Sequence, residues 1–147
     1  MYRRLVPVAC VLLASLAFTG VIDPLPIGSA APLTDYAMTS TEGEALTLAG
    51  VAGPRGLLVI FSANTCPWVL RWENRYNTIA EVAAAKGVGV VLVNANEGQR
   101  DGVDSMDAMR THAQRNAYAM PYVVDAHHRL ADAFGATRTP DVFLFDE

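Results

Sequence analysis

Cys66 occupies a position in the chain where a thiol gains reactivity. It lies between an apolar run over residues 57–62, which predicts a strand, and Pro67, which suits the first position of a helix. Backbone N–H groups at a helix start have no partner within the helix, and the helix dipole is positive there, so a thiolate is favoured over a thiol. Trp68 adds a flat apolar surface able to seat a disulfide or a peptide. We therefore expect a nucleophilic thiolate at Cys66, with Trp68 as part of its substrate-binding surface.

A buried, unreactive Cys66 is the alternative, because free cysteines often pack as small apolar side chains. Cys66 lies where a strand meets a helix start and is followed by proline and a bulky aromatic residue. This position favours a reactive cysteine, or one that descends from a reactive cysteine. The reactive thiol is therefore the leading hypothesis.

The other candidate sites in the sequence have weaker support than Cys66. His127 and His128 stand at a predicted helix start, where we expect them to be solvated, and we expect neither a metal ion nor a cofactor. Residues 50–56 lack the Lys-Ser/Thr pair of a phosphate-binding loop and precede a strand instead of following one. That glycine-rich segment therefore predicts a turn.

Strands and helices alternate after residue 56. Apolar runs predict strands over residues 57–62, 88–93, 122–124 and 141–145. Helices are predicted over residues 67–87, 104–116 (capped by Asp104) and 127–134. This βαβαβαβ order, which follows an irregular N-terminal section, favours an α/β sheet with parallel neighbours.

The helix after Cys66 is predicted from one apolar stripe. Its members are spaced 3, 4, 3 and 4 residues apart: Val69, Trp72, Tyr76, Ile79 and Ala83. The charged residues of the same segment fall off that stripe and predict a solvated surface: Arg71, Glu73 and Arg75.

Composition excludes several classes of protein. A chain of 147 residues is long enough for one domain with a core, and 52% hydrophobic with 18% charged residues excludes a disordered tail. The net charge of −4 means that the chain lacks the excess of basic residues typical of nucleic-acid-binding proteins, so we expect no nucleic-acid partner.

Residues 1–22 predict an export signal. Arg3 and Arg4 precede an apolar run over residues 5–17, and small residues that suit a signal peptidase follow. An uncleaved membrane anchor is the alternative, although a proline, a threonine and a glycine dilute the apolar run. We expect residues 23–147 to be exported to the periplasm or another extracytoplasmic space, with membrane contact only through the signal or anchor. If the signal is removed, Cys10 is lost with it and Cys66 remains as a single thiol in an oxidising compartment.

The chain from about residue 27 to 147 resembles the thioredoxin-fold redoxins, in particular the peroxiredoxin-like branch of the alkyl hydroperoxide reductase/thiol-specific antioxidant family. The order and spacing of several segments carry the resemblance: 27–32 with its G-x-x-A-P pattern, 61–69 around Cys66, 94–96, 104–109, 122–125 and 134–146. It implies an α/β thioredoxin-like fold, with a central mixed sheet flanked by helices.

The resemblance also implies a cis proline that faces the sulfur just before the last strand. Thr139 and Pro140 hold the matching positions, so the resemblance assigns them to the substrate-binding site together with Trp68. The alternative is that Pro140 merely starts an edge strand.

Departures from the family pattern limit the mechanism. A dithiol cycle needs a second cysteine that resolves the mixed disulfide, either three residues after the first or, in some members of this branch, three before. Those positions hold Val69 and Ala63, so no internal dithiol cycle is available to the mature chain. The P-x-x-x-T-x-x-C pattern of true peroxiredoxins is also absent, because Val59 and Ala63 replace its Pro and Thr. Arg138 is one candidate for the distant arginine that activates peroxide in that family.

A copper site is disfavoured for a similar reason. Thioredoxin-fold copper chaperones combine a C-x-x-x-C pattern with a distant histidine, and His112, His127 and His128 are available here for the histidine role. The second cysteine of that pattern is absent, so we expect no copper site.

The resemblance implies one further strand and a covering helix after the cis-proline strand. Because the sequence stops at Glu147, directly after that strand, we expect the fold to lack these two elements, and the chain to be a fragment or the start of a longer protein. On its own, such a chain would be poorly stable and prone to associate.

Two functions follow. The leading one is an exported thiol oxidoreductase, or one-cysteine peroxidase-like protein, that acts through Cys66 in redox homeostasis. Its partners would be thiol or disulfide proteins, a small-molecule reductant, or a peroxide. The alternative is a non-catalytic thioredoxin-fold binding domain, which the missing second thiol favours, whereas the placement of Cys66 and the retained Thr139-Pro140 pair favour the enzyme.

Overall fold

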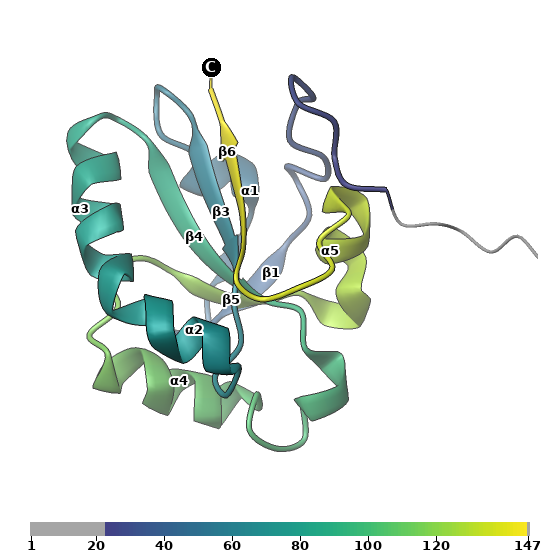
Figure 1. The fold of residues 1–147 in the computed structure, drawn as a ribbon, viewed down its shortest axis with the longest axis vertical. Helices are drawn as coiled ribbons and strands as arrows, with labels where there is room; N and C mark the ends of the chain where they lie inside the picture. Colours follow the sequence, from purple (N-terminus) through teal and green to yellow (C-terminus); the bar gives the residue numbers. More distant parts are fainter. Residues whose placement is uncertain (1–22, 147) are drawn as a thin grey trace, which may run out of the picture.

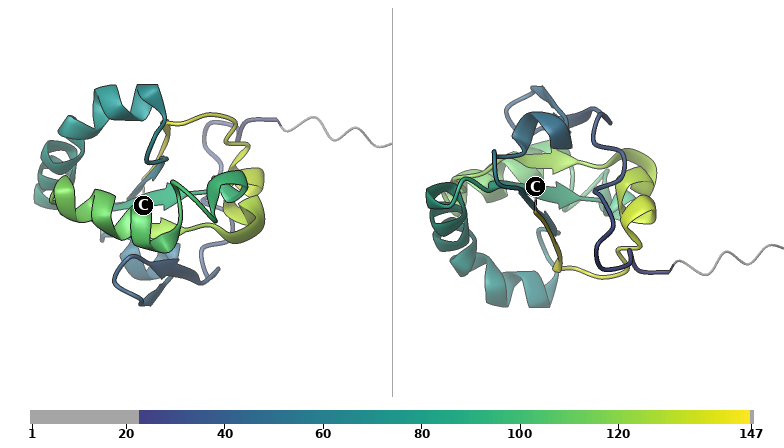
Figure 2. Two further views of the ribbon diagram at one scale, coloured as in Figure 1. Left: turned by 90° about the horizontal axis from the view of Figure 1, so that it is seen from below. Right: turned by 90° about the horizontal axis from the view of Figure 1, so that it is seen from above.

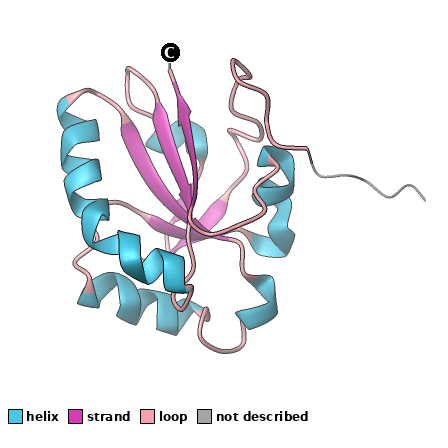
Figure 3. Ribbon diagram, viewed as in Figure 1, coloured by secondary structure: helices cyan, strands magenta, loops and turns pink. Residues whose placement is uncertain are grey.

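A single mixed β-sheet forms the centre of the molecule in the computed structural model, which describes residues 23–146 (Figures 1 and 3). Its strand order is β2-β1-β5-β4-β3-β6. The strands are β1 (Met38–Ser40), β2 (Ala45–Leu46), β3 (Leu57–Phe61), β4 (Gly89–Asn94), β5 (Tyr122–Val124) and β6 (Asp141–Phe145). The expected mixed α/β sheet flanked by helices is confirmed.

Parallel pairing is restricted to the middle of the sheet. β3 pairs with β4, and β4 with β5, in parallel, whereas β6 runs antiparallel to β3 with Phe61 opposite Asp141. The expectation of parallel neighbours is therefore wrong for β6. The preceding helix α5 (Arg129–Phe134) has six residues and rises about 9 Å, too little to return the chain along a five-residue strand of about 16 Å. The last strand therefore starts at the end of the sheet where β3 finishes.

Helices cover both faces of the sheet (Figures 1 and 2). One face carries α2 (Pro67–Trp72), the 3-10 turn η1 (Glu73–Arg75), α3 (Tyr76–Ala85) and α4 (Met106–Arg115). The other face carries α1 (Leu48–Val51) and α5. Two further 3-10 turns, η2 (Glu97–Gln99) and η3 (Ala126–His128), lie in the connections.

The central strand β3 contributes to a hydrophobic core on each side of the sheet. Val59 and Phe61 belong to the core beneath α1 and α5, and Ile60 belongs to the core beneath α2, α3 and α4. Successive side chains of a strand point to opposite faces, so a strand covered on both sides must be apolar throughout. This explains the unbroken apolar run that predicted β3.

The helix predicted over residues 67–87 is interrupted. α2 ends at Trp72, η1 follows, and α3 starts at Tyr76. Val69 and Tyr76 are buried as predicted, but Trp72 is 49% exposed and Glu73 takes the inward position. The tighter winding of η1 changes the register, which is why a stripe drawn for one continuous helix misplaces Trp72.

Smaller differences concern the ends of elements. The N-cap of α4 is Ser105, whose hydroxyl accepts a hydrogen bond from the N–H of Ala108, and Asp104 is used elsewhere. The predicted turn near residue 54 is present, with Gly53 and Gly56 paired in an isolated bridge.

The N-terminal signal prediction falls on residues 1–22, which lie outside the described part of the chain. Within residues 23–146, no helix is long and apolar enough to cross a membrane.

Candidate functional site

Cys66 is the N-cap residue of α2, directly after the loop that leaves β3. Its carbonyl accepts the first hydrogen bond of the helix from the N–H of Leu70, at 3.0 Å. Its side chain is partly buried and packs against the core beneath α2 and α3. The strand-to-helix junction predicted for this cysteine is therefore present.

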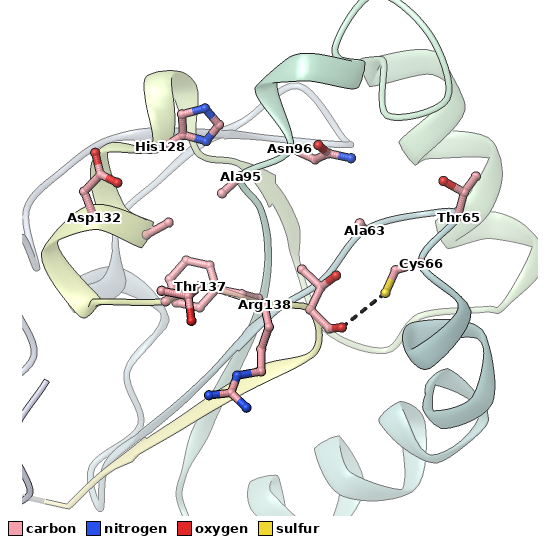
Figure 4. Close-up of a pocket in the computed structure, with 13 residues that line it drawn as sticks. Ala63, Thr65, Cys66, Ala95, Asn96, His128, Asp132, Thr137 and Arg138 are labelled. Atoms are coloured by element: carbon pink, nitrogen blue, oxygen red, sulfur yellow. Dashed lines mark hydrogen bonds between the residues drawn. The ribbon is translucent and has the colours of Figure 1, made fainter. Parts of the chain in front are cut away.

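The loop before β6 brings Thr139 to the sulfur. Because β6 pairs antiparallel with β3, its first residue lies opposite Phe61, and the preceding residues pass in front of Cys66. Cys66 Sγ donates to the Thr139 carbonyl oxygen at 3.2 Å (Figure 4). The peptide bond between Thr139 and Pro140 is cis.

Opposing effects act on the Cys66 thiol, and their sum lowers its pKa. Partial burial raises the pKa, whereas hydrogen bonds with the Thr139 side chain and with the backbone at Val69 and Trp68 lower it. A thiolate cannot donate to the Thr139 carbonyl, so this bond belongs to the protonated form, whereas the Thr139 hydroxyl and the backbone N–H groups are donors that favour the thiolate. Cys66 is therefore a thiol whose surroundings favour ionisation.

An open cavity of about 390 Å³ lies against Cys66 (Figure 4). Thr65 and Thr139 line it near the sulfur, and its polar lining is completed by Asn96, His128, Asp132, Thr137 and Arg138 (Figure 4). Trp68 does not line it, because this side chain is 61% exposed on the outer side of α2. Of the residues assigned to the site, the cavity therefore brings together Cys66 and Thr139; Pro140 follows in the same loop, and Trp68 adjoins the site from outside.

A buried polar network holds the loop that carries Cys66, and the sequence did not identify it as part of the site. The Asp104 carboxylate accepts three hydrogen bonds: from the N–H of Asn64 (2.8 Å), from Asn94 Nδ2 (2.8 Å) and from Asn96 Nδ2 (2.6 Å). Tyr122 closes the network by donating to Asn64 Oδ1 at 3.0 Å. The one signal available was the run of Asn and Asp residues around two strand ends, which by itself predicts only a polar loop.

The family follows from comparison with known proteins. A model of the redoxin family matches residues 26–147. The chain belongs to the redoxin family. No curated protein sequence matches it.

Solved structures agree with this redoxin fold. An uncharacterized conserved protein from Geobacillus kaustophilus is 30% identical with a TM-score of 0.77, over 82% of this chain and 64% of that protein. The redoxin chain thus spans less than two thirds of this relative's length. Peroxiredoxin Q of Xanthomonas campestris (18% identity, TM-score 0.62, covering 80% and 77% of the two chains) shares the fold. So does a secreted Mycobacterium tuberculosis disulfide oxidoreductase homologous to E. coli DsbE (15% identity, TM-score 0.61, covering 75% of each chain).

The positions of the missing cysteines are not equivalent in this redoxin. Ala63 lines the cavity together with Cys66, whereas Val69 is a fully buried residue on the inner side of α2. Arg138 lines the same cavity, but its guanidinium points away from the sulfur (Figure 4). A thiol at position 63 would therefore share the cavity with Cys66.

His128 lines the same cavity as Cys66, on the side away from the sulfur (Figure 4). His127 and His128 are exposed, as expected, and no group of three or more His, Cys, Asp or Glu side chains in residues 23–146 is arranged to hold a metal ion. His112 lies instead with Nε2 2.7 Å from Glu73 Oε2.

Glu73 differs from the solvated residue that was expected. Its side chain is only 12% exposed, because η1 turns it inward, where Tyr118 also donates to it at 3.0 Å. Burial and the Glu73 charge raise the pKa of Tyr118, which keeps this phenol a donor. Arg71 and Arg75 are exposed as predicted.

Proposed function

We propose that this redoxin is a one-cysteine thiol oxidoreductase that forms mixed disulfides with partner proteins through Cys66. The observation that carries the proposal is the arrangement at the sulfur: a helix N-cap, hydrogen bonds that lower the thiol pKa, and an open cavity in front. A thiolate is the form of cysteine that attacks disulfides.

The proposed reaction has two exchange steps. The Cys66 thiolate attacks one sulfur of a partner disulfide, the Cys66 S–S bond forms, and the other partner sulfur leaves as a thiolate with the bonding electron pair. An external thiolate, from a protein or a small molecule, then attacks the partner sulfur of the mixed disulfide. A disulfide forms between the external and partner sulfurs, and Cys66 leaves as a thiolate with the electron pair of the broken S–S bond. The external thiol is needed because Ala63 and Val69 occupy both positions of a resolving cysteine.

Peroxide reduction is the second candidate, because Arg138 lines the same cavity as Cys66. The thiolate would attack a peroxide oxygen, forming a sulfenic acid and releasing water or an alcohol, and two external thiols would reduce the sulfenic acid. Val59 and Ala63 replace the Pro and Thr of the peroxiredoxin pattern, so we rank this reaction below disulfide exchange.

The pKa of Cys66, measured by pH-dependent alkylation of the reduced protein, tests the proposal. In the chain of residues 23–147, which lacks Cys10, we expect a midpoint well below the roughly 8.5 of a free thiol, with no alkylation in Cys66→Ser. Consumption of a model disulfide or of hydrogen peroxide, each with excess external thiol, then ranks the two reactions. A normal or raised pKa without exchange would leave a non-catalytic binding domain.

Export is part of the proposal. Its support is the basic and apolar pattern of residues 1–22, and the M. tuberculosis neighbour is described as secreted. Residues 1–40 fused to leaderless alkaline phosphatase should give active phosphatase in bacteria. An Arg3→Glu/Arg4→Glu version of the fusion should lose most of that activity.

A further inference from the structure

We propose that the outer side of α2 and η1 is a docking surface for an acidic segment of the partner polypeptide whose sulfur reacts with Cys66. The surface consists of Trp68, Arg71, Trp72 and Arg75, and we call it the Trp–Arg face. The inference rests on the proposed function, since it names the kind of partner that reaches the same thiol.

The four side chains form one exposed row. Trp68, Arg71 and Trp72 stand at positions i, i+3 and i+4 of α2, the spacing that places residues on one side of a helix, and Arg75 of η1 joins them by stacking on Trp72. Trp68 and Trp72 are 61% and 49% exposed. The Arg71 guanidinium lies over the Trp68 ring at 5.5 Å from its centroid, and Arg75 lies over the Trp72 ring at 4.4 Å. Arg75 Nη1 also donates to the Arg71 carbonyl oxygen at 3.2 Å. Each arginine is thus held against an indole, and both remain exposed.

Glu73, the acidic residue of this segment, does not lie on the Trp–Arg face. Glu73 is turned to the opposite side of the helix, where His112 and Tyr118 hold it. Within residues 23–146, neither Arg71 nor Arg75 forms an ion pair. The face is therefore cationic on a chain whose net charge is −4, so its charge is not a general property of the surface.

The chemistry of the face determines its ligand. Guanidinium groups stacked on indoles bind carboxylates through charge, and the indoles supply apolar contact for the residues between them. The row begins two residues after Cys66, so a chain bound along it has a residue at the sulfur. Along the axis, Arg71 lies about 8 Å from Cys66, and Arg75, at the end of the more extended η1, lies about 15 Å away, which corresponds to roughly two and four to five residues of an extended peptide. The preferred partner therefore carries Asp or Glu about two and four residues from its reactive cysteine.

Peptide exchange rates test this inference. Three peptides of one length carry a cysteine activated as a mixed disulfide with 2-thiopyridine and have Glu, Gln or Lys at the second and fourth positions after it. Cys66 attacks the peptide sulfur, the Cys66–peptide disulfide forms, and thiopyridine leaves with the electron pair and is followed by its absorbance. The reduced protein is used either as residues 23–147 or as the full chain with Cys10→Ser, so that Cys66 is the one thiol that can react.

We expect the Glu peptide to react about five- to tenfold faster than the Gln peptide at low ionic strength, and the Lys peptide to react slowest. The advantage should disappear in 0.5 M NaCl, because exposed charges are screened there. R71Q/R75Q should bring the Glu-to-Gln rate ratio to about one. The matched control R55Q/R115Q removes the same charge from exposed sites on other elements and should keep the ratio.

The remaining outcomes separate this inference from the proposed function. Reaction with 2,2′-dithiodipyridine, a small neutral disulfide, reports the thiol alone: if Cys66 does not react with it, the proposed function and the inference both fail. If it reacts but does not distinguish the three peptides, only the inference is overturned. Equal slowing of all three peptides by R71Q/R75Q, or arginine-dependent binding to anionic phosphatidylglycerol vesicles without any peptide preference, would also overturn it.

Discussion

At Cys66 the same side chain is desolvated and hydrogen-bonded, and the hydrogen bonds outweigh the burial. The lowered pKa therefore depends on a few named contacts, of which the Thr139 side chain comes from 73 residues away in the sequence. Replacing the Thr139 hydroxyl should therefore change the pKa of Cys66 while the thiol itself stays in place.

Thr139→Val should raise the pKa of Cys66, because the substitution removes the side-chain donor and leaves the backbone carbonyl in place. The alkylation profile should shift to higher pH, so that the rate at pH 6–7 falls while the limiting rate at high pH is kept. Thr137→Val, which changes another threonine of the same cavity, is the control and should leave the profile unchanged. An unshifted profile in Thr139→Val would contradict the role given to this hydroxyl.

Ala63→Cys should convert the one-thiol site into a dithiol site. Position 63 lies beside Cys66 on the wall of the same cavity, so we expect an internal disulfide to form on mild oxidation. In the chain of residues 23–147, which lacks Cys10, thiol titration should find two thiols per reduced chain and none after oxidation. The double variant Ala63→Cys/Cys66→Ser should keep its single thiol, and a persistent pair of free thiols in Ala63→Cys would show that the loop geometry is wrong for a disulfide.

Among the elements, the loop between β3 and α2 is anchored from outside its own segment. Asp104, which precedes α4, accepts a hydrogen bond from the Asn64 N–H two residues before Cys66, and it also binds Asn94 at the end of β4. Because Asp104 and Asn94 are fully buried, each unsatisfied donor in this network would be costly.

Asp104→Asn should therefore destabilise the protein by about 1–3 kcal/mol, because an amide nitrogen would face donors that now bind a carboxylate. Urea denaturation measures this loss, and slower Cys66 alkylation at neutral pH would show that the loop has shifted. Asp101→Asn, a change of the same kind at an exposed neighbouring position, should alter neither quantity.

At the scale of the whole molecule, β6 is the edge of the sheet and exposes apolar side chains. Val142 is 56% and Leu144 is 69% exposed, and one long edge of β6 has no strand beside it within residues 23–146. An exposed, apolar edge strand is a template for pairing with another chain.

We predict that the 147-residue chain associates through β6 and that Leu144→Lys reduces this association. Sedimentation velocity at several concentrations measures the change. Val103→Lys, which places the same charge at another exposed apolar side chain, is the control. Association that is equal in the two variants would assign it to a different surface.

Local pattern determined much of this redoxin. The apolar runs predicted β3, β4, β5 and β6, and the strand-to-helix junction singled out Cys66, because burial and helix starts leave direct marks on neighbouring residues. The exposure of Trp72, the burial of Glu73 and the reversed direction of β6 were not predictable in this way. The positions of Trp72 and Glu73 depend on the 3-10 turn between α2 and α3. The direction of β6 depends on the short connection through α5 and on its pairing with β3.

The sequence by itself determined the strands and most of the helical segments after residue 56 and which thiol is available, since hydrophobic periodicity, turn residues and cysteine positions are local properties. Only the tertiary structure decided what surrounds that thiol. Thr139 reaches Cys66 because β6 pairs with β3, and Asp104 holds the loop because β4 ends and α4 begins beside it. These contacts join residues 40 to 73 positions apart, and strand pairing and packing, not local pattern, bring them together.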